Sequence, residues 1–395
     1  MERAELLALL TPDGLTLLDD VSGSDTGGDP VAAVSRLRAA GHSPALVAAV
    51  LTQARLRVKA RSKFGDFASR MLFTEAGLEQ ATRLRVAALH AGRFERAGLT
   101  NVADLGCGIG GDAMAFAALG LQVTAVDVDE VTATVASYNL APFESSSVEH
   151  RAAEDVDLTR FDALYFDPAR RTAGHANTSR LTRYADYTPS LDLVFEAAAT
   201  RPTGVKLGPG FDRDLIPDEA EAQWVSVDGQ VVELGLWFGA LARIGIRRSA
   251  LVLDAAGSHE MHAAADSEDV DGGPLGAYLW EPDGAVIRAR LIGDVARSLD
   301  ARMLSDGIAY LTGDREGTTP FATGFRVLER FALDERTLKR ELRSRGIGTL
   351  EVKKRGADID PAAFRTRMGL KGPNSATLVL TRVDGRHAAL LCERL

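Results

Sequence analysis

Apolar residues recur at helical spacing through the first part of the chain. The apolar run 6–10 begins a first helical face, and the turn-rich segment 22–30 follows it. Ser43-Pro44 predicts a helix start, because a capping hydroxyl precedes proline at the first helical position. The spacing predicts one further helix over 74–89. We therefore predict an N-terminal helical region over residues 1–95.

The pattern changes to strand–helix–strand at Asn101. Short apolar runs predict strands, and the segments between them have helical periodicity. The expected strands are 102–105, 122–128, 148–151, 163–166, 204–207, 231–238 and 250–254, and the expected helices are 112–119, 131–139 and 191–200. Such alternation predicts an α/β fold with a parallel, doubly wound sheet over residues 96–258.

A polar, acidic stretch over 259–273 reads as a domain boundary. Its His259-Glu260-Met261-His262 does not match the HExxH zinc pattern, and we interpret it as a polar linker. Beyond it an α+β domain is expected over 274–395, clearest from residue 325. Its expected elements are strands at 325–332 and 349–354, a helix over 334–345 capped by Asp334, a helix starting at Asp360-Pro361, and a hairpin of 376–383 with 387–394.

The composition narrows the class of protein. The 395 residues are 46% hydrophobic and 26% charged, which is typical of a globular chain. No apolar run approaches the roughly 18 residues of a membrane span, and the N-terminus lacks the pattern of a signal peptide. Cys107 and Cys392 are the only cysteines, which excludes a disulfide framework or a cysteine zinc site. We expect a cytoplasmic protein with no membrane and no metal partner.

Charge is distributed unevenly along the chain. The net charge is −9, yet residues 325–395 hold 16 Lys and Arg against 9 Asp and Glu. This asymmetry indicates a C-terminal end that contacts nucleic acid. A solvated basic helix would give the same count, so both interpretations stay open.

The strongest motif is the sequence from Asp104 to Gly111, DLGCGIGG, between an expected strand and helix. Its glycines allow a tight turn and close approach of a ligand. The spacing of the glycines alone permits NAD. Asp104, however, would repel a pyrophosphate and attract an ammonium or sulfonium group, which favours S-adenosylmethionine. Asp127, 21 positions after Gly106, suits ribose hydroxyls.

This motif resembles motif I of class I S-adenosylmethionine-dependent methyltransferases. The resemblance implies their Rossmann-like sheet and assigns Asp104 and the glycines to the methionine part of the cofactor and Asp127 to the ribose. It implies an adenine contact by Glu154 or Asp155, between which the sequence does not choose. The cofactor-binding residues implied in this part of the chain are Asp104, Gly106, Gly108, Gly110, Asp127, Val128, Glu154 and Asp155.

Asp167-Pro168-Ala169-Arg170 follows the fourth expected strand and resembles the Asp/Asn-Pro-Pro-aromatic motif of amino-group methyltransferases. That resemblance implies that Asp167 and the Pro168 carbonyl accept hydrogen bonds from the reacting amine. Ala169 replaces the second proline and Arg170 the aromatic, although a guanidinium also stacks on bases. The motif also resembles that of uridine-5-methyltransferases, which need a cysteine nucleophile. Cys107 lies in the cofactor loop and Cys392 at the far end of the sequence, which disfavours carbon methylation by that route. Alternatively, Asp167-Pro168 simply ends a strand.

Basic residues follow this motif. Arg171 and Arg180 stand near aromatic residues in the next loop and suit an RNA backbone, or they lie on a solvated surface loop. Lys206, at the end of the fifth expected strand, either meets substrate phosphate or pairs with a carboxylate.

The segment around Phe73-Thr74 resembles the stretch before the core of trimethylguanosine synthase-like RNA methyltransferases. The resemblance implies that Phe73 and Thr74 line the cofactor pocket. Ordinary core packing of Phe73 is the alternative.

The C-terminal segments 350–356 and 376–382 resemble the THUMP-like domain that follows a methyltransferase core in a bacterial family. THUMP domains proper bind RNA, so the resemblance favours RNA as a partner. A solvated basic face is the alternative to RNA contact here. The candidate phosphate contacts are Lys353, Lys354, Arg355, Arg365, Arg367 and Lys371.

Three hypotheses follow. The first is a methyltransferase acting on a nitrogen of an RNA base, with Asp167, Pro168 and Arg170 at the reaction centre. The second is a methyltransferase for a small molecule or protein, and the third is a non-catalytic protein that binds S-adenosylmethionine and RNA. The sequence predicts neither the RNA nor the oligomeric state.

Overall fold

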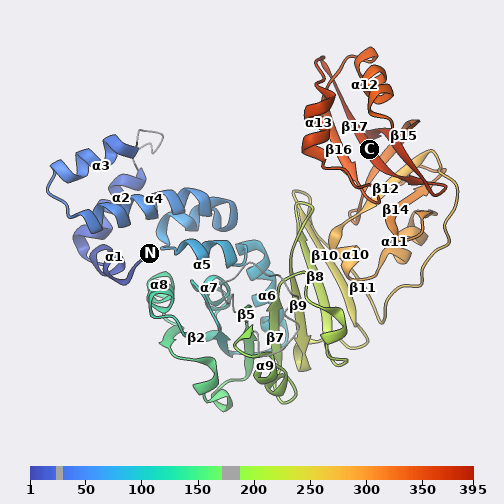
Figure 1. Cartoon of the computed structure of the whole chain (residues 1–395). Helices are drawn as coiled ribbons and strands as arrows, with labels where there is room; N and C mark the ends of the chain where they lie inside the picture. Colours follow the sequence, from blue (N-terminus) through green and yellow to red (C-terminus); the bar gives the residue numbers. More distant parts are fainter. Residues whose placement is uncertain (24–29, 171–186) are drawn as a thin grey trace. The chain divides into compact units, whose positions relative to one another are not determined.

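The computed structural model describes residues 1–23, 30–170 and 187–395 (Figure 1). It divides into two compact units. Unit 1 comprises Met1–Leu207 and Leu236–Ala242, and unit 2 comprises Gly208–Gly235 and Arg243–Leu395. The bounds predicted above for three domains stay a prediction.

Helices form the N-terminal part of unit 1, as expected. The Ser43 hydroxyl accepts a hydrogen bond from the backbone N–H of Leu46 at 3.2 Å, which confirms the predicted cap. The longest helix carries a buried Gln53 and a buried Arg57 that bind backbone carbonyls of Phe73 and Met71. The helices are α1 (Arg3–Leu9), α2 (Pro12–Gly23), α3 (Pro30–Ala39) and α4 (Pro44–Phe64).

The prediction of a single helix over 74–89 is wrong. The structure has α5 (Glu75–Gln80) and α6 (Leu84–Arg96), separated at Ala81, which has extended backbone angles of φ −58° and ψ 137°. The Lys63 ammonium accounts for the break, because it donates to the carbonyls of Leu78, Glu79 and Ala81 at 2.7–2.8 Å. Those carbonyls are the groups that a continuing helix would have used.

A nine-stranded sheet follows, in the order β11-β10-β8-β9-β7-β4-β1-β2-β3. Strands β1, β2, β3, β4 and β7 are parallel. After β3 the chain returns to the other side of β1, so β1 and β4 flank the topological switch point at which such sheets bind ligands. Their bounds are β1 (Asn101–Leu105), β2 (Gln122–Asp127), β3 (Ser146–His150), β4 (Ala163–Phe166) and β7 (Thr203–Leu207), with α7 (Gly111–Ala118), α8 (Glu130–Leu140) and α9 (Leu191–Ala198) between them. The predicted α/β fold class is confirmed.

The linker interpretation of residues 259–262 is wrong. They lie in β11 (Gly257–Ala263), which pairs antiparallel with β10 (Arg248–Asp254). Glu260 of β11 accepts hydrogen bonds from Arg243, Gln223 and Ser249, so a partly buried ion pair explains the polar sequence. Strand β8 (Glu221–Val227), which the sequence did not predict, joins β9 (Gln230–Phe238) in the same sheet.

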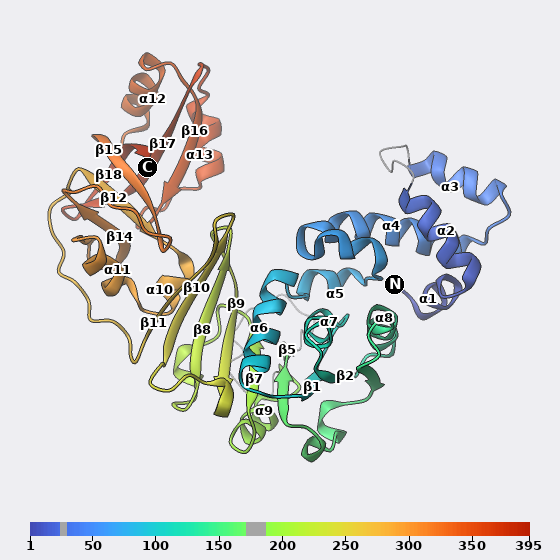
Figure 2. The ribbon, with the colours of Figure 1, turned by 180° about the vertical axis from the view of Figure 1, so that it is seen from behind.

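A seven-stranded sheet forms the C-terminal part of unit 2, in the order β13-β14-β12-β15-β18-β17-β16 (Figure 2). Asp334 and Asp360 cap its two larger helices as predicted, each accepting a backbone N–H bond. The predicted hairpin is also present. The strands are β12 (Tyr278–Pro282), β13 (Arg302–Ser305), β14 (Ile308–Gly313), β15 (Ala322–Ala332), β16 (Ile347–Lys354), β17 (Asn374–Val383) and β18 (Arg386–Arg394), and the helices are α10 (Gly284–Arg288), α11 (Ile292–Ser298), α12 (Glu335–Ser344) and α13 (Pro361–Met368).

Candidate functional site

The glycine loop joins β1 to α7 at the switch point. Gly106, Gly108 and Gly110 have φ values of +84°, +56° and +84°, a region that side chains other than glycine seldom adopt. The backbone N–H groups of Gly106 and Cys107 both donate to the Val126 carbonyl, at 2.9 and 3.0 Å. These bonds hold the loop against the end of β2.

Asp127 ends β2 and supports the same loop. Its Oδ2 accepts the Gly108 N–H at 3.0 Å, and its Oδ1 accepts the Asp129 N–H at 2.9 Å. Burial raises the pKa of the Asp127 carboxyl, against the lowering effect of these two bonds. Its neighbour Val128 is 56% exposed. The ribose contact that the resemblance implies for Asp127 and Val128 stays a prediction.

Asp104 lies beneath the loop and is 1% exposed. Among the described residues, neither of its carboxylate oxygens has a hydrogen-bond partner. Burial, then the charges of Asp112 and Asp167, raise the pKa of Asp104 well above its usual range. A buried polar group without a partner is unfavourable, and a cationic ligand group would relieve the cost. The ammonium and sulfonium of S-adenosylmethionine fit this environment.

Phe73 and Thr74 precede α5, which lies against the glycine loop. The Phe73 ring is fully buried and packs on Phe64 with ring centroids 5.8 Å apart, as the core-packing alternative describes. Thr74 caps α5 by accepting the Gly77 N–H at 2.9 Å and is partly exposed. A side chain at Gly77 would overlap Ile109 of the loop. A cofactor contact from Phe73-Thr74 stays a prediction, and the exposure favours Thr74.

Glu154 and Asp155 lie in a short 3₁₀ helix, Ala153–Asp155, and both are exposed. Glu154 Oε1 accepts the backbone N–H of Ser190 at 3.4 Å. The choice between the two for the adenine contact stays open.

The Asp167-Pro168 segment contacts the glycine loop directly. The Asp167 N–H donates to the Leu105 carbonyl at 3.1 Å. A Cβ built on Gly106 would stand 2.9 Å from the Asp167 carbonyl oxygen. The candidate acceptor-binding motif and the candidate cofactor loop are therefore adjacent.

The segment after Pro168 forms a short antiparallel pair, in which β5 (Ala169–Arg170) faces β6 (Tyr187–Thr188). Arg171 and Arg180 lie outside the described residues, and the side chain of Arg170 is not described. Their predicted contacts with substrate stay predictions.

Lys206 pairs with a carboxylate, one of the two alternatives left open by the sequence. Its Nζ lies 2.5 Å from Asp167 Oδ2 and donates to the Thr82 hydroxyl at 2.9 Å. The lysine side chain is 10% exposed. Thr82 was not among the predicted site residues, because nothing in the local sequence marks a threonine 124 positions before its partner.

The predicted phosphate contacts in the C-terminal domain are only partly available. Lys353 donates to Glu281 at 2.6 Å, and Arg355 lies 3.5 Å from the same carboxylate. Lys354 is exposed. Glu281 in β12 therefore forms ion pairs with two of the predicted cations.

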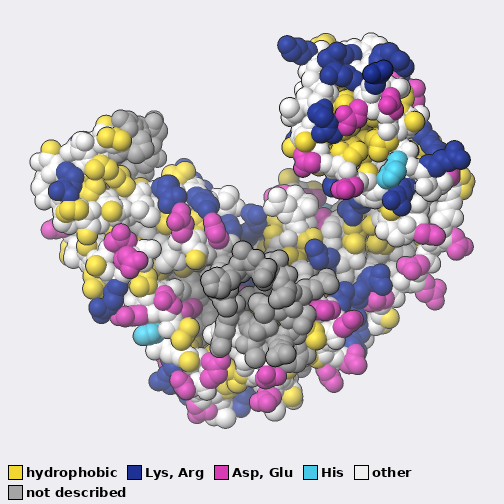
Figure 3. Space-filling model, in the orientation of Figure 1, with side chains coloured by type: hydrophobic (Ala, Val, Ile, Leu, Met, Phe, Trp, Pro, Cys, Tyr) yellow, Lys and Arg dark blue, Asp and Glu magenta, His cyan; other side chains and the backbone are white. Residues whose placement is uncertain are grey.

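Helix α12 instead presents a row of exposed arginines, Arg336, Arg340 and Arg343. Their spacing of four and three residues places them on one helix face, opposite the buried Leu338 and Leu342. Figure 3 shows Lys and Arg side chains gathered over this part of the C-terminal domain. We call these three residues the α12 arginine row. The helical period of 335–344 was a signal that could have identified it.

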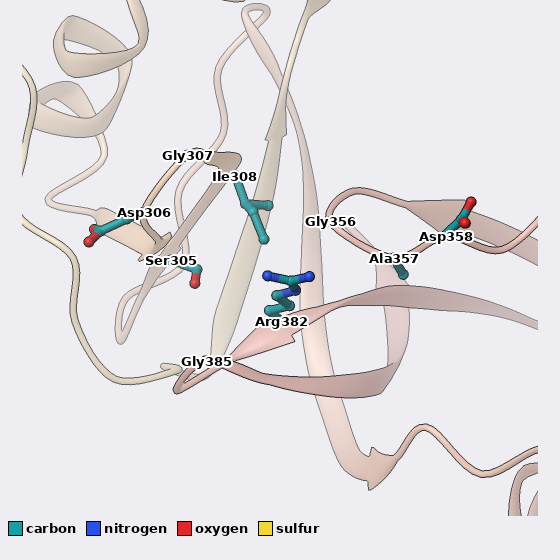
Figure 4. A pocket seen from close by; sticks show the side chains of 9 residues that line it. All are labelled: Ser305, Asp306, Gly307, Ile308, Gly356, Ala357, Asp358, Arg382 and Gly385. Atoms are coloured by element: carbon teal, nitrogen blue, oxygen red, sulfur yellow. The ribbon is translucent and has the colours of Figure 1, made fainter.

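A hollow of about 550 Å³ lies among three turns of the C-terminal domain (Figure 4). Arg382, Asp306 and Asp358 supply its charged groups, beside turns at Gly307, Gly356 and Gly385. The hollow is open and has both acidic and basic side chains, so its lining does not indicate a particular class of ligand.

Two features are absent from the part of the chain that the structure describes. No described helix is long and apolar enough to cross a membrane. Over residues 1–23, 30–170 and 187–395, no group of three or more His, Cys, Asp or Glu side chains is arranged to hold a metal ion.

Comparison with known proteins identifies the family. Residues 322–394 match the THUMP domain-like family, and residues 2–60 match a domain of unknown function. The chain is 35% identical over 356 residues to an uncharacterised S-adenosylmethionine-dependent methyltransferase of Mycobacterium tuberculosis, known from two strains. The match covers 88% of this chain and 95% of that protein. The chain belongs to the S-adenosylmethionine-dependent methyltransferases.

The fold of this methyltransferase also has a solved counterpart. A predicted methyltransferase from Porphyromonas gingivalis superposes with a TM-score of 0.72 at 20% identity, covering 100% of this chain and 99% of that one. The chain therefore has the predicted methyltransferase fold and the predicted THUMP-like domain at its C-terminus, and its family uses the predicted cofactor, S-adenosylmethionine.

Proposed function

We propose that this methyltransferase modifies an exocyclic or ring nitrogen of a base in RNA. The observation that carries the proposal is the close approach of Asp167 to the glycine loop. A Cβ built on Gly106 would lie only 2.9 Å from the carbonyl oxygen of Asp167. An acceptor nitrogen held by Asp167 would stand beside the groups proposed to hold the methyl donor. S-adenosylmethionine supplies the methyl group as an electrophilic sulfonium when bound.

Each residue at this site has a proposed task. The Asp104 carboxylate would receive the ammonium of the methionine part, and Asp127 the ribose hydroxyls. Asp167 and the Pro168 carbonyl would accept hydrogen bonds from the amino group and direct its lone pair, so that positioning supplies much of the rate. Arg170 would stack on the base or contact phosphate.

The α12 arginine row supports RNA as the substrate. Arg336, Arg340 and Arg343 are exposed on one helix face, and phosphate contacts by such side chains release counterions from the nucleic acid. The charge excess over residues 325–395 lies in the same domain.

Methyl transfer from tritiated S-adenosylmethionine to total RNA from a strain lacking the gene tests this function. We expect label in the RNA and, after digestion, in a nucleoside methylated on a base nitrogen. Asp167→Ala should lower the transfer rate about 100-fold or more, because it removes the acceptor of the amine's hydrogen bond. Binding of S-adenosylmethionine, measured by calorimetry, should persist in this variant.

Asp192→Ala, at an exposed carboxylate in α9, is the matched control and should transfer at the wild-type rate. Label in protein or small molecules alone would contradict RNA as the substrate. Cofactor binding without transfer to any acceptor would favour a sensor instead.

A further inference from the structure

A chain of buried polar groups leads from Asp167 into the core of unit 1. Lys206 contacts Asp167 Oδ2 at 2.5 Å and the Thr82 hydroxyl at 2.9 Å. Thr82 in turn donates to Asp112 Oδ2 at 2.6 Å, and Asp112 Oδ1 lies 2.9 Å from His90 Nδ1. Thr82, Asp112 and His90 are 3–6% exposed. Lys206 also donates to the Gln80 carbonyl at 3.4 Å, so buried polar groups hold the lysine in place.

Packing alone does not explain a lysine at this position. Burying an ammonium is expensive, and an apolar side chain of similar volume often packs at lower cost. The contact engages Oδ2 of Asp167, while the Asp167 side chain keeps 30% of its surface exposed. Lys206 therefore fixes a carboxylate that still faces the site.

The charges around Asp167 make this contact consequential. The Asp167 charge acts on the buried Asp104 of β1, together with the charges of Asp112 of α7 and Asp127 of β2. Neighbouring carboxylates oppose one another's ionisation and so raise the pKa of Asp104, whereas the Lys206 ammonium lowers it. Other charged or titratable groups that interact with this cluster include Cys107, Lys63, His90, Asp129 and His150.

We propose that Lys206 is a positioning residue for methyl transfer: anchored on Thr82, it fixes one carboxylate oxygen of Asp167 and keeps that side chain ionised to accept the amino group of the substrate. The inference rests on the proposed role of Asp167. It adds a residue outside the Asp-Pro motif and outside the cofactor loop.

A titration of Asp167 tests the electrostatic part without any substrate. Protein labelled with ¹³C at the aspartate carboxyls would be followed by NMR, and the Asp167 signal assigned by its loss in Asp167→Asn. In Lys206→Met the Asp167 midpoint should rise by about one pH unit or more, since an opposite charge in contact has been removed. Lys206→Arg should keep the midpoint near wild type. An unchanged midpoint in Lys206→Met would overturn the proposal.

Kinetics test the positioning part, using total RNA and tritiated S-adenosylmethionine. In Lys206→Met the acid limb of the kcat profile should move to higher pH while KM for RNA changes less than twofold, and Lys206→Arg should restore the limb. If Lys206 had only a structural role, Lys206→Met would lower the melting temperature and leave the acid limb of the kcat profile in place. That result would contradict the proposal.

Thr82→Val keeps the test decisive if Lys206→Met folds poorly. This variant retains the ammonium and removes its anchor, so kcat should fall several-fold with the acid limb unmoved. An unchanged kcat would refute anchoring by Thr82. A wild-type protein that methylates no RNA would refute the proposed function, whereas the NMR titration would still decide the role of Lys206.

Discussion

Two buried carboxylates of unit 1, Asp104 and Asp112, differ because of their hydrogen-bond partners. Burial raises the pKa of both, but at Asp112 the hydrogen bond and charge of His90, the charge of Lys206 and the bond from Thr82 outweigh it and hold the pKa below the usual range. Asp104 has no hydrogen-bond partner among the described residues, and its pKa rises. The site thus keeps one carboxyl that a cationic ligand would satisfy.

The raised pKa of Asp104 predicts a pH-dependent stability. Between the unfolded value and the raised folded value, the native state binds more protons than the unfolded state, so the free energy of unfolding should fall as pH rises through that window. Asp104→Asn should remove this decline, and saturating S-adenosylmethionine should offset it by stabilising the charged form. Denaturant titrations at several pH values measure the effect. Asp192→Asn is the control, and an equal slope in wild type and Asp104→Asn would disprove the assignment.

Gly106 and Gly108 offer a matched pair of substitutions. Both have positive φ, so alanine at either costs about 1–2 kcal/mol in backbone strain. Only at Gly106 would the new Cβ press on Asp167, since no described atom lies within 4 Å of one at Gly108. Gly106→Ala should therefore lose more free energy of unfolding and more methyl transfer than Gly108→Ala. Chemical denaturation and methyl-transfer assays measure both losses. Equal losses in the two variants would argue against the close approach of Asp167 to Gly106.

At the scale of elements, charged side chains decide where several helices and strands end or pair. Lys63 ends α5 by binding its last carbonyls. The polar strand β11 is held in its sheet through Glu260 and Arg243. Periodicity does not reveal either effect, because the partners lie in other elements.

Arg243→Met should destabilise unit 2. Glu221 is fully buried and receives three hydrogen bonds from the Arg243 guanidinium at 2.6–3.3 Å. Removing that partner leaves a buried carboxylate with fewer compensating bonds, at a cost of about 3–5 kcal/mol. Arg247→Met, which breaks a pair with the exposed Asp218, is the control and should cost under about 1 kcal/mol. Similar midpoints for both variants in chemical denaturation would show that the buried pair is dispensable.

At the scale of the whole molecule, a methyltransferase sheet and a THUMP-like domain occur in one chain. Strands β8, β10 and β11 of the large sheet belong to the same compact unit as the THUMP-like domain.

RNA affinity should depend on the α12 arginine row. Replacing Arg336, Arg340 and Arg343 with Gln should weaken binding of total RNA and lower the slope of log affinity against log salt by about 0.7–0.9 for each phosphate that the protein no longer neutralises. The control replaces Arg36, Arg38 and Arg61, exposed residues of α3 and α4, and changes the net charge equally. Filter binding at several salt concentrations measures both. If the wild type, the α12 variant and the control variant had the same slope of log affinity against log salt, α12 would not belong to the RNA-binding surface.

Much of the fold could be predicted from the sequence. Apolar runs marked most strands of the large sheet, and the caps at Ser43, Asp334 and Asp360 marked helix starts, because these signals act between near neighbours in the chain. The glycine loop with Asp104 and Asp127 also indicated the cofactor, since spacing and charge are properties of the sequence itself.

Only the tertiary structure decided which charges are available. Lys353 and Lys206 look alike in sequence, as cations at the ends of strands, yet one binds Glu281 and the other Asp167. The break before α6 and the pairing of β11 arise in the same way. Each depends on side chains that meet across many residues of sequence, and a long-range ion pair leaves no periodic signal for local reasoning to detect. The sequence therefore determined the fold class and the cofactor loop, and the packing of the chain determined which groups remain free to act.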